Sequence, residues 1–119
     1  MEHHPTQALE LKTLDGTSEG VRIIKVRGPL TIHNFFEFQD LTRQHPRAAV
    51  MLIDLAEVPY IDSAALGSLI GLHVSCGRAG EKYALLKANE RLRSLFAMCG
   101  VDQLLVTFDS AEAAEAALL

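Results

Sequence analysis

The feature that most constrains the fold is an almost continuous apolar stretch at residues 48–55, with the sequence AAVMLIDL. Its one polar member is Asp54. A half-exposed strand alternates apolar and polar residues, whereas a run without alternation is typical of a strand buried on both faces. We therefore expect residues 50–55 to form an internal strand, parallel to a neighbour, in a sheet that carries helices.

The rest of the chain divides into strands and helices at turn and capping residues. Two glycines and short polar side chains at 13–20 favour a turn between two strands, and Gly28-Pro29 ends the second strand. Strands are expected at 8–11, 21–26, 48–55, 83–86 and 104–108. Helices are expected from Ile32 to a stop at His45-Pro46, at 64–78 with Gly77 and Gly80 as terminators, at 90–98 after an Asn89 cap, and at 111–118 after Asp109-Ser110.

This order of elements, β-β-α-β-α-β-α-β-α, predicts a fold of the α/β class. The sheet is expected to be mixed, with four or five strands, about four helices and right-handed crossovers. A chain of 119 residues and 13.0 kDa has the size of one domain and can bury a core without disulfides or metals. We expect residues 8–119 to form that domain and residues 1–7 to be a frayed N-terminus.

Composition and charge exclude several classes of function. The net charge is -4 and the sequence contains no run of Lys or Arg, which argues against a nucleic-acid partner. Cys76 and Cys99 lack C-x-x-C spacing and are typical of free thiols in a reducing cytosol. The start of the chain does not have the pattern of a signal peptide, and no stretch of about 18 apolar residues occurs, so we expect a cytoplasmic protein without membrane insertion.

The segment after the apolar strand carries the most informative pattern. Residues 52–70, LIDLAEVPYIDSAALGSLI, resemble the signature segment of STAS domains, a family named for sulfate transporters and anti-sigma factor antagonists. In that family a central strand ending in Asp-Leu is followed by a short loop, then Asp-Ser or Asp-Thr, and then a helix that begins with x-Gly-Leu-Gly. Asp62, Ser63, Leu66 and Gly67 match this pattern. Segments 21–30 and 92–106 extend the resemblance, so that it covers most of the chain.

The resemblance implies a non-catalytic binding module without a cofactor. The expected partner is an anti-sigma factor of the GHKL kinase type, which the unphosphorylated chain captures and which switches the chain off by phosphorylating Ser63. The expected partner-binding surface comprises Thr31, Asp62, Ser63, Ala64, Ala65, Gly67, Ser68 and Gly71.

Two departures from the family pattern favour a different reading. Ala65 stands where the family most often has Gly, and its methyl group would narrow the approach of a partner. Thr31 takes the place of an acidic residue near the phosphoacceptor. The alternative is therefore a STAS scaffold or regulatory subunit of a signalling or lipid-transport complex, in which Ser63 only caps a helix and is never phosphorylated.

The residues themselves support a switch independently of the family. Ser63 is expected at or next to a helix N-cap, where free N–H groups and the helix dipole accept an anion such as phosphate. A phosphoserine adds about -1.5 to -2 charges, which oppose the docking of an apolar partner. Small residues form one face of this helix, and larger residues, Leu66, Leu69, Ile70 and Val74, are expected to fill the core.

Catalytic and metal-binding readings find little support. Asp54 and Asp62 could act as paired carboxylates, but no nucleophile and base accompany them, so we interpret both as structural. Gly77-Arg78-Ala79-Gly80 lacks the Lys and Ser/Thr of a phosphate-binding loop. The five histidines, His3, His4, His33, His45 and His73, lack metal-ligand spacing apart from the adjacent pair at 3 and 4.

We predict that the purified protein neither hydrolyses nucleoside triphosphates nor binds a divalent metal tightly, because the sequence has neither a phosphate loop nor a ligand cluster. Elemental analysis should find no stoichiometric zinc, and a phosphate-release assay should find no sustained turnover. Turnover that persists after contaminating enzymes are removed would contradict this prediction.

Overall fold

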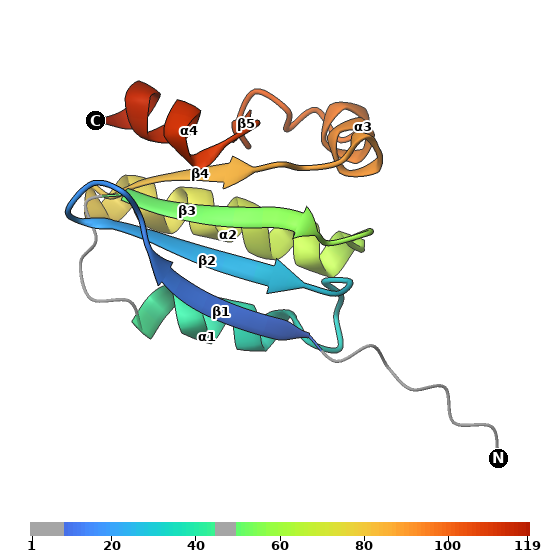
Figure 1. Cartoon of the computed structure of the whole chain (residues 1–119). Helices are drawn as coiled ribbons and strands as arrows, with labels where there is room; N and C mark the ends of the chain where they lie inside the picture. Colours follow the sequence, from blue (N-terminus) through green and yellow to red (C-terminus); the bar gives the residue numbers. More distant parts are fainter. Residues whose placement is uncertain (1–8, 45–49) are drawn as a thin grey trace, which may run out of the picture.

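A computed structural model describes residues 9–44 and 50–119, which form a five-stranded sheet with helices packed against it (Figure 1). The strand order is β1-β2-β3-β4-β5. β1 is antiparallel to β2, and the remaining neighbours are parallel, so the sheet is mixed as predicted. The strands are β1 (Glu10–Asp15), β2 (Val21–Arg27), β3 (Val50–Glu57), β4 (Lys82–Leu86) and β5 (Thr107–Phe108).

β3 is the internal strand that its apolar sequence predicts. It pairs with β2 on one side and β4 on the other. Because successive side chains of a strand point to opposite faces, β3 contributes to two cores. Met51, Ile53 and Leu55 join the larger core, and Val50 and Leu52 join a smaller one on the opposite face.

The helices α1 (Phe35–Gln44), α2 (Ser63–Ala79) and α3 (Glu90–Met98) contribute to the larger core, and α4 (Ala111–Leu118) covers the smaller one. Phe38 of α1, Leu69 of α2 and Phe96 of α3 are almost fully buried there. Ala114 of α4 packs on the opposite face. None of the helices among residues 9–44 and 50–119 is long and apolar enough to cross a membrane.

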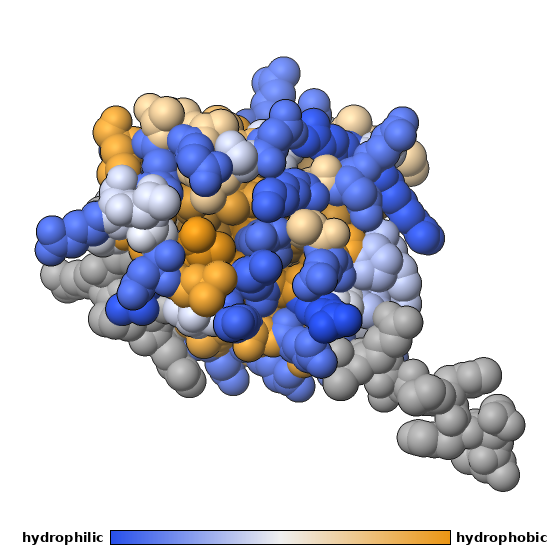
Figure 2. All heavy atoms as spheres, in the orientation of Figure 1, coloured by the Kyte–Doolittle hydropathy of each residue, from blue (hydrophilic) through white to orange (hydrophobic). Residues whose placement is uncertain are grey.

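α4 leaves part of its face of the sheet uncovered. Where β1 pairs with β2, Glu10 lies opposite Arg27 and Lys12 lies opposite Lys25. Arg27 also forms a 3.6 Å ion pair with Glu10. Figure 2 shows polar side chains spread over this side of the molecule with apolar side chains between them. An antiparallel pair of strands tolerates one solvated face, so this surface needs no cover.

The caps of α3 and α4 are those predicted, whereas the N-cap of α2 is Asp62. Asn89 accepts a hydrogen bond from Leu92 N–H, and Ser110 accepts one from Ala113 N–H. At the C-terminus of α2 the predicted Gly80 is the cap, with a left-handed φ of 70°, but Gly77 lies within the helix and does not end it.

Three expected boundaries are wrong. β1 continues to Asp15, so the turn begins at Gly16, and the expected start of this strand at Ala8 lies outside the described residues. The last strand contains only Thr107–Phe108. Leu105, expected in this strand, lies in the turn before it and is fully buried there. Ile32 precedes α1, which begins at Phe35. The expected helix stop at His45-Pro46 and the frayed N-terminus lie outside the described residues.

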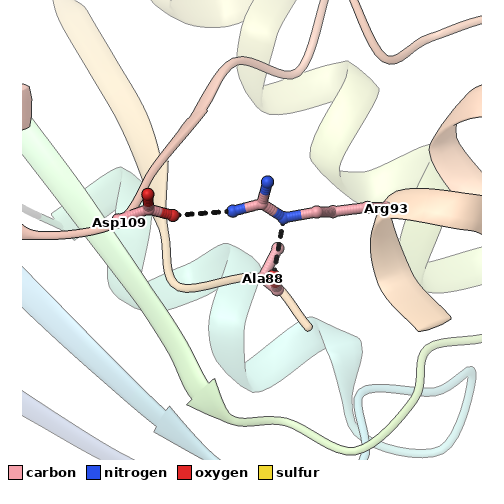
Figure 3. A network of polar contacts seen from close by, with 3 residues as sticks. All are labelled: Ala88, Arg93 and Asp109. Atoms are coloured by element: carbon pink, nitrogen blue, oxygen red, sulfur yellow. Dashed lines mark hydrogen bonds and ion pairs between the residues drawn. The ribbon is translucent and has the colours of Figure 1, made fainter. Parts of the chain in front are cut away.

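Arg93 of α3 contacts the segments that precede α3 and α4 (Figure 3). Arg93 Nε donates a hydrogen bond to the Ala88 carbonyl at 2.9 Å, and its guanidinium contacts Asp109 Oδ1 at 3.0 Å. The Asp109 side chain is 91% exposed, so this ion pair positions the segment and contributes little to stability.

A buried carboxylate that sequence reasoning did not identify joins the two ends of the domain. Glu115 of α4 is only 5% exposed, and its oxygens accept hydrogen bonds from Thr17 Oγ1 at 2.9 and 3.0 Å and from Ser18 N–H at 3.0 Å. Hydrogen bonding to Ser18 lowers the pKa of Glu115 from its ordinary 4.5, burial opposes this in part, and Thr17 lowers it further.

We predict that Glu115→Gln lowers the melting temperature at neutral pH. Since the pKa is depressed in the folded state, the carboxylate stabilises the fold above about 4.5, and this contribution is lost as the pH falls through the lower folded value. The difference from the parent should therefore shrink in acid. Glu112→Gln, at an exposed position in the first turn of the same helix, is the control and should lower the melting temperature by less, because it removes only an exposed interaction with the helix end. A difference that stays constant with pH would contradict the prediction.

Candidate functional site

Two connections lie side by side where β2 and β3 end. The carboxyl ends of parallel strands meet at the same edge of a sheet, so the segment after β2 and the segment after β3 become neighbours. Leu30 pairs with Ile61 in a parallel bridge. Leu30 N–H donates to the Tyr60 carbonyl and Asp62 N–H donates to the Leu30 carbonyl, both at 3.2 Å. The fold thus brings the segment of Thr31 next to the segment of Asp62 and Ser63.

Asp62 uses both of its carboxylate oxygens at this junction. Oδ1 accepts a hydrogen bond from Ala65 N–H at 2.9 Å and caps α2, while Oδ2 accepts one from Ile32 N–H at 2.9 Å. Burial raises the pKa of Asp62, but hydrogen bonds from Ala65, Ile32 and Ala64 and the nearby His33 outweigh it, so that the pKa lies below 3.8. Asp62 is therefore a carboxylate at all physiological pH values.

Asp54 serves a local purpose at the end of β3. Its Oδ1 accepts a hydrogen bond from Ala56 N–H at 2.9 Å, and its side chain is nearly buried. Asp54 thus accepts a backbone N–H near the end of β3, and Asp62 accepts backbone N–H groups at the start of α2 and before α1. Both carboxylates therefore act as structural acceptors.

Ser63 is the first residue of α2, and it is exposed. Ser63 lies next to the N-cap, as expected, whereas the alternative in which Ser63 itself caps the helix is wrong, because Asp62 takes that role. The serine hydroxyl is therefore not required to begin the helix. It stands in the first turn, where backbone N–H groups and the positive end of the helix dipole favour an anion.

The exposed side of α2 is a stripe of small residues. Ser63, Gly67, Gly71 and Ser75 recur every fourth position, so they follow one face of the helix. All four are exposed, and a Cβ atom added at Gly67 or Gly71 would meet nothing within 4 Å. Ala64 is half-buried beside this stripe. We call these four residues the small-residue stripe.

Two residues assigned to the partner surface do not belong to it. Ala65 is fully buried and Ser68 is 6% exposed, because both lie on the side of α2 that faces the protein interior. The Ala65 methyl group therefore cannot narrow the approach of a partner, contrary to our expectation. In the opposite sense, Val74 was expected in the core and is 45% exposed.

Exposed apolar side chains flank the junction, and sequence reasoning missed them. Ile32 and Phe36 are 58% and 62% exposed, and the Phe36 ring stacks on Phe35 with 4.2 Å between centroids. On the α3 side, Tyr60 and Met98 line an open cavity of about 470 Å³. Residues with helical spacing are normally assigned to the core, so only the tertiary structure could show that these are exposed.

The described part of the chain offers little for a cofactor or metal. Among residues 9–44 and 50–119 no group of three His, Cys, Asp or Glu side chains could hold a metal ion. A second open cavity, of about 590 Å³, is lined by Arg27 and Glu57, and Ser63 is not among its lining residues. His73 Nδ1 lies 2.9 Å from the Tyr83 hydroxyl.

Comparison with known proteins identifies the class of domain. Residues 12–114 match the STAS domain, and the chain belongs to the STAS domain family, as its sequence motif predicts. No protein of curated function matches the sequence.

Solved structures show the same fold at low sequence identity. The Thermotoga maritima protein TM1081, a candidate anti-sigma factor antagonist, is 22% identical with a TM-score of 0.75, and the match covers 98% of each chain. Unphosphorylated SpoIIAA of Bacillus, an anti-sigma factor antagonist, is 15% identical with a TM-score of 0.72 over 92% of this chain and 96% of that one. The murine anion transporter Slc26a9 is 17% identical with a TM-score of 0.78, over 95% of this chain and 22% of that one.

We predict that the Ile32 and Ala65 amide resonances titrate together in acid, because both N–H groups donate to the Asp62 carboxylate. In ¹H–¹⁵N spectra their common midpoint should lie below 3.8, since the folded state favours the ionised form. Asp62→Asn should abolish both titrations. Midpoints at or above 3.8 would show that the carboxylate is not held as described.

Proposed function

We propose that this protein is an anti-sigma factor antagonist that binds an anti-sigma factor of the GHKL kinase type and is switched off by phosphorylation at Ser63. The observation that carries the proposal is the position of Ser63, exposed in the first turn of α2 and not used as the helix cap. Membership of the STAS family supports it. This function takes place in the cytoplasm.

The surroundings of Ser63 suit a phosphate without refolding. N–H groups of the first helical turn stabilise negative charge, so the folded domain tolerates the modification. The same charge of about -1.5 to -2 lies on the helix face of Gly67 and Gly71 and next to Asp62, whose carboxylate bonds the backbone of the exposed, apolar Ile32. A partner that covers these apolar groups would have to desolvate the phosphate, which opposes binding.

The proposed partner surface differs from the one expected from the sequence. Ala65 and Ser68 are removed because they are buried. Thr31, Asp62, Ser63, Ala64, Gly67 and Gly71 remain, and the exposed Ile32 and Phe36 are added. Large apolar side chains beside a stripe of small residues allow close approach of a partner helix and provide anchors for it.

The chain is proposed to be the substrate of a kinase and not an enzyme. Its contribution to phosphoryl transfer is an exposed hydroxyl, whose oxygen forms the new bond to the γ-phosphate of a nucleotide bound by the partner. The partner supplies the nucleotide, the base and the metal. ADP is the leaving group, and the hydroxyl proton passes to the partner's base.

A scaffold or regulatory subunit of a signalling or lipid-transport complex is the second candidate. The likeness to Slc26a9, of which this fold spans 22%, favours it, as does Thr31 at the position of an acidic residue. In this case Ser63 is not phosphorylated. A neighbouring gene for a GHKL kinase would favour the first candidate, and neighbouring transporter genes would favour the second.

We predict that Ser63→Ala and Ser63→Asp fold alike but bind the anti-sigma partner differently. Neither change removes the cap, so stability should change by less than the ~1 kcal/mol typical of a lost cap. The Ala variant should bind and resist release, whereas the Asp variant should bind at least about tenfold more weakly, because a charge is buried in an apolar contact. Chemical unfolding and titration calorimetry measure the two effects.

Ser75→Asp is the matched control, because it places the same charge on the same stripe, about 18 Å further along the helix. It should weaken binding less than Ser63→Asp. If the parent, Ser63→Ala and Ser63→Asp bind the anti-sigma partner equally well, the switch is refuted and the scaffold function takes its place. The same conclusion would follow if mass spectrometry of protein from its own cells finds no phosphate on Ser63 under any condition.

A further inference from the structure

We propose that Asp62 is a positioning residue that couples the phosphorylation of Ser63 to the apolar surface formed by Ile32 and Phe36. This inference rests on the proposed function and adds a mechanism to it. Phosphorylation would then act in two ways: by its own charge, and by releasing the connection between β2 and α1 from α2.

The first step of the argument is the double use of the Asp62 carboxylate. One oxygen holds Ala65 N–H within α2, and the other holds Ile32 N–H, 30 residues earlier in the chain. Both contacts are 2.9 Å long. Hydrogen bonds to an ionised group are stronger than neutral ones, so this side chain is an effective clamp between two segments.

The second step is what the clamp holds. Before Ile32, Leu30 is buried and fixed to Tyr60 and Asp62 by backbone hydrogen bonds. After Ile32, Asn34 closes a small turn, since its Oδ1 accepts from Thr31 N–H at 2.9 Å. The bond to Asp62 is therefore the last tie to α2 before the chain enters α1 with its exposed Phe36.

The third step is competition for donors. A phosphate on Ser63 lies next to Asp62 and can accept hydrogen bonds from the same N–H groups of the first turn, those of Ala64 and Ala65. Hydrogen bonds from these two groups are among the contacts that hold the Asp62 carboxylate ionised. Two neighbouring anions repel each other, so the carboxylate is displaced from the helix end and its bond to Ile32 weakens.

One substitution separates the clamp from the cap. Asn caps helices as well as Asp does, and its single side-chain oxygen can accept from Ala65 N–H. Its second group is an NH₂ donor, which cannot accept from Ile32 N–H. Asp62→Asn thus keeps the cap and loses the clamp, whereas Asp62→Ala loses both.

The test uses the full chain with phosphoserine incorporated at position 63 during synthesis, so that no kinase is needed. Amide hydrogen exchange and ¹H–¹⁵N shifts of Ile32 and Ala65 are compared in the parent, the phosphoserine form and Asp62→Asn. Ile32 is distant in sequence from both changes, so its intrinsic exchange rate is unaffected. Ser110→Ala, which removes the α4 cap bond to Ala113, is the matched control for loss of a cap.

We expect the Ile32 amide to exchange about tenfold faster in the phosphoserine form and in Asp62→Asn, the factor corresponding to a lost hydrogen bond to a charged group. Ala65 should stay protected in Asp62→Asn, and Ser110→Ala should leave Ile32 unchanged. Asp62→Asn should also weaken binding of the anti-sigma partner while Ser63 carries no phosphate.

The outcomes separate this inference from the proposed function. If phosphoserine weakens partner binding but Ile32 exchanges as in the parent, the switch function stands and the coupling through Asp62 is wrong. If Ile32 responds but phosphoserine leaves partner binding unchanged, the coupling stands and the proposed function is wrong. If Ile32 in Asp62→Asn exchanges as in the parent, the clamp itself is refuted.

Discussion

Burial of β3 on both faces is the constraint on which the rest of the structure depends. Met51, Ile53 and Leu55 cannot be covered unless α1, α2 and α3 pack on one side, and Val50 and Leu52 require α4 on the other. Helices on both faces imply parallel crossovers, and parallel strands place their carboxyl ends at one edge. The junction that holds Asp62 and Ser63 is a direct consequence of this arrangement.

At that edge the chain uses few polar contacts, and each has more than one consequence. Asp62 begins α2 and ties it to the connection that precedes α1. Because it provides the cap, the neighbouring serine is free to stand exposed in the helix's first turn. In the proposed switch, the charge of a phosphate on Ser63 would oppose partner binding in two ways, through its own desolvation and through the loss of the Asp62 bond to Ile32.

Exposed apolar side chains gather at this edge of the sheet. Ile32, Phe36, Tyr60 and Met98 are each at least 40% exposed, and they lie on either side of the segment that leads into α2. Isolated exposed apolar residues are ordinary, but several at one edge of the sheet fit the partner surface that we propose. The buried Ala65 and Ser68 support this surface from beneath and take no direct part in contacts.

The sequence alone determined the elements with strong local signals. The apolar run of β3, the Asn89 and Ser110 caps and the Asp-Ser motif could all be interpreted from neighbouring residues, because strand burial, capping and the family pattern depend on short spacings. Only the tertiary structure decided that Asp62 reaches Ile32, that Glu115 holds Thr17 across 98 residues, and that Phe36 is exposed while Ala65 is buried. These features depend on which distant segments the fold brings together. The spacing of apolar residues along the chain predicts a helix or a strand, but it does not show which of those residues another element covers.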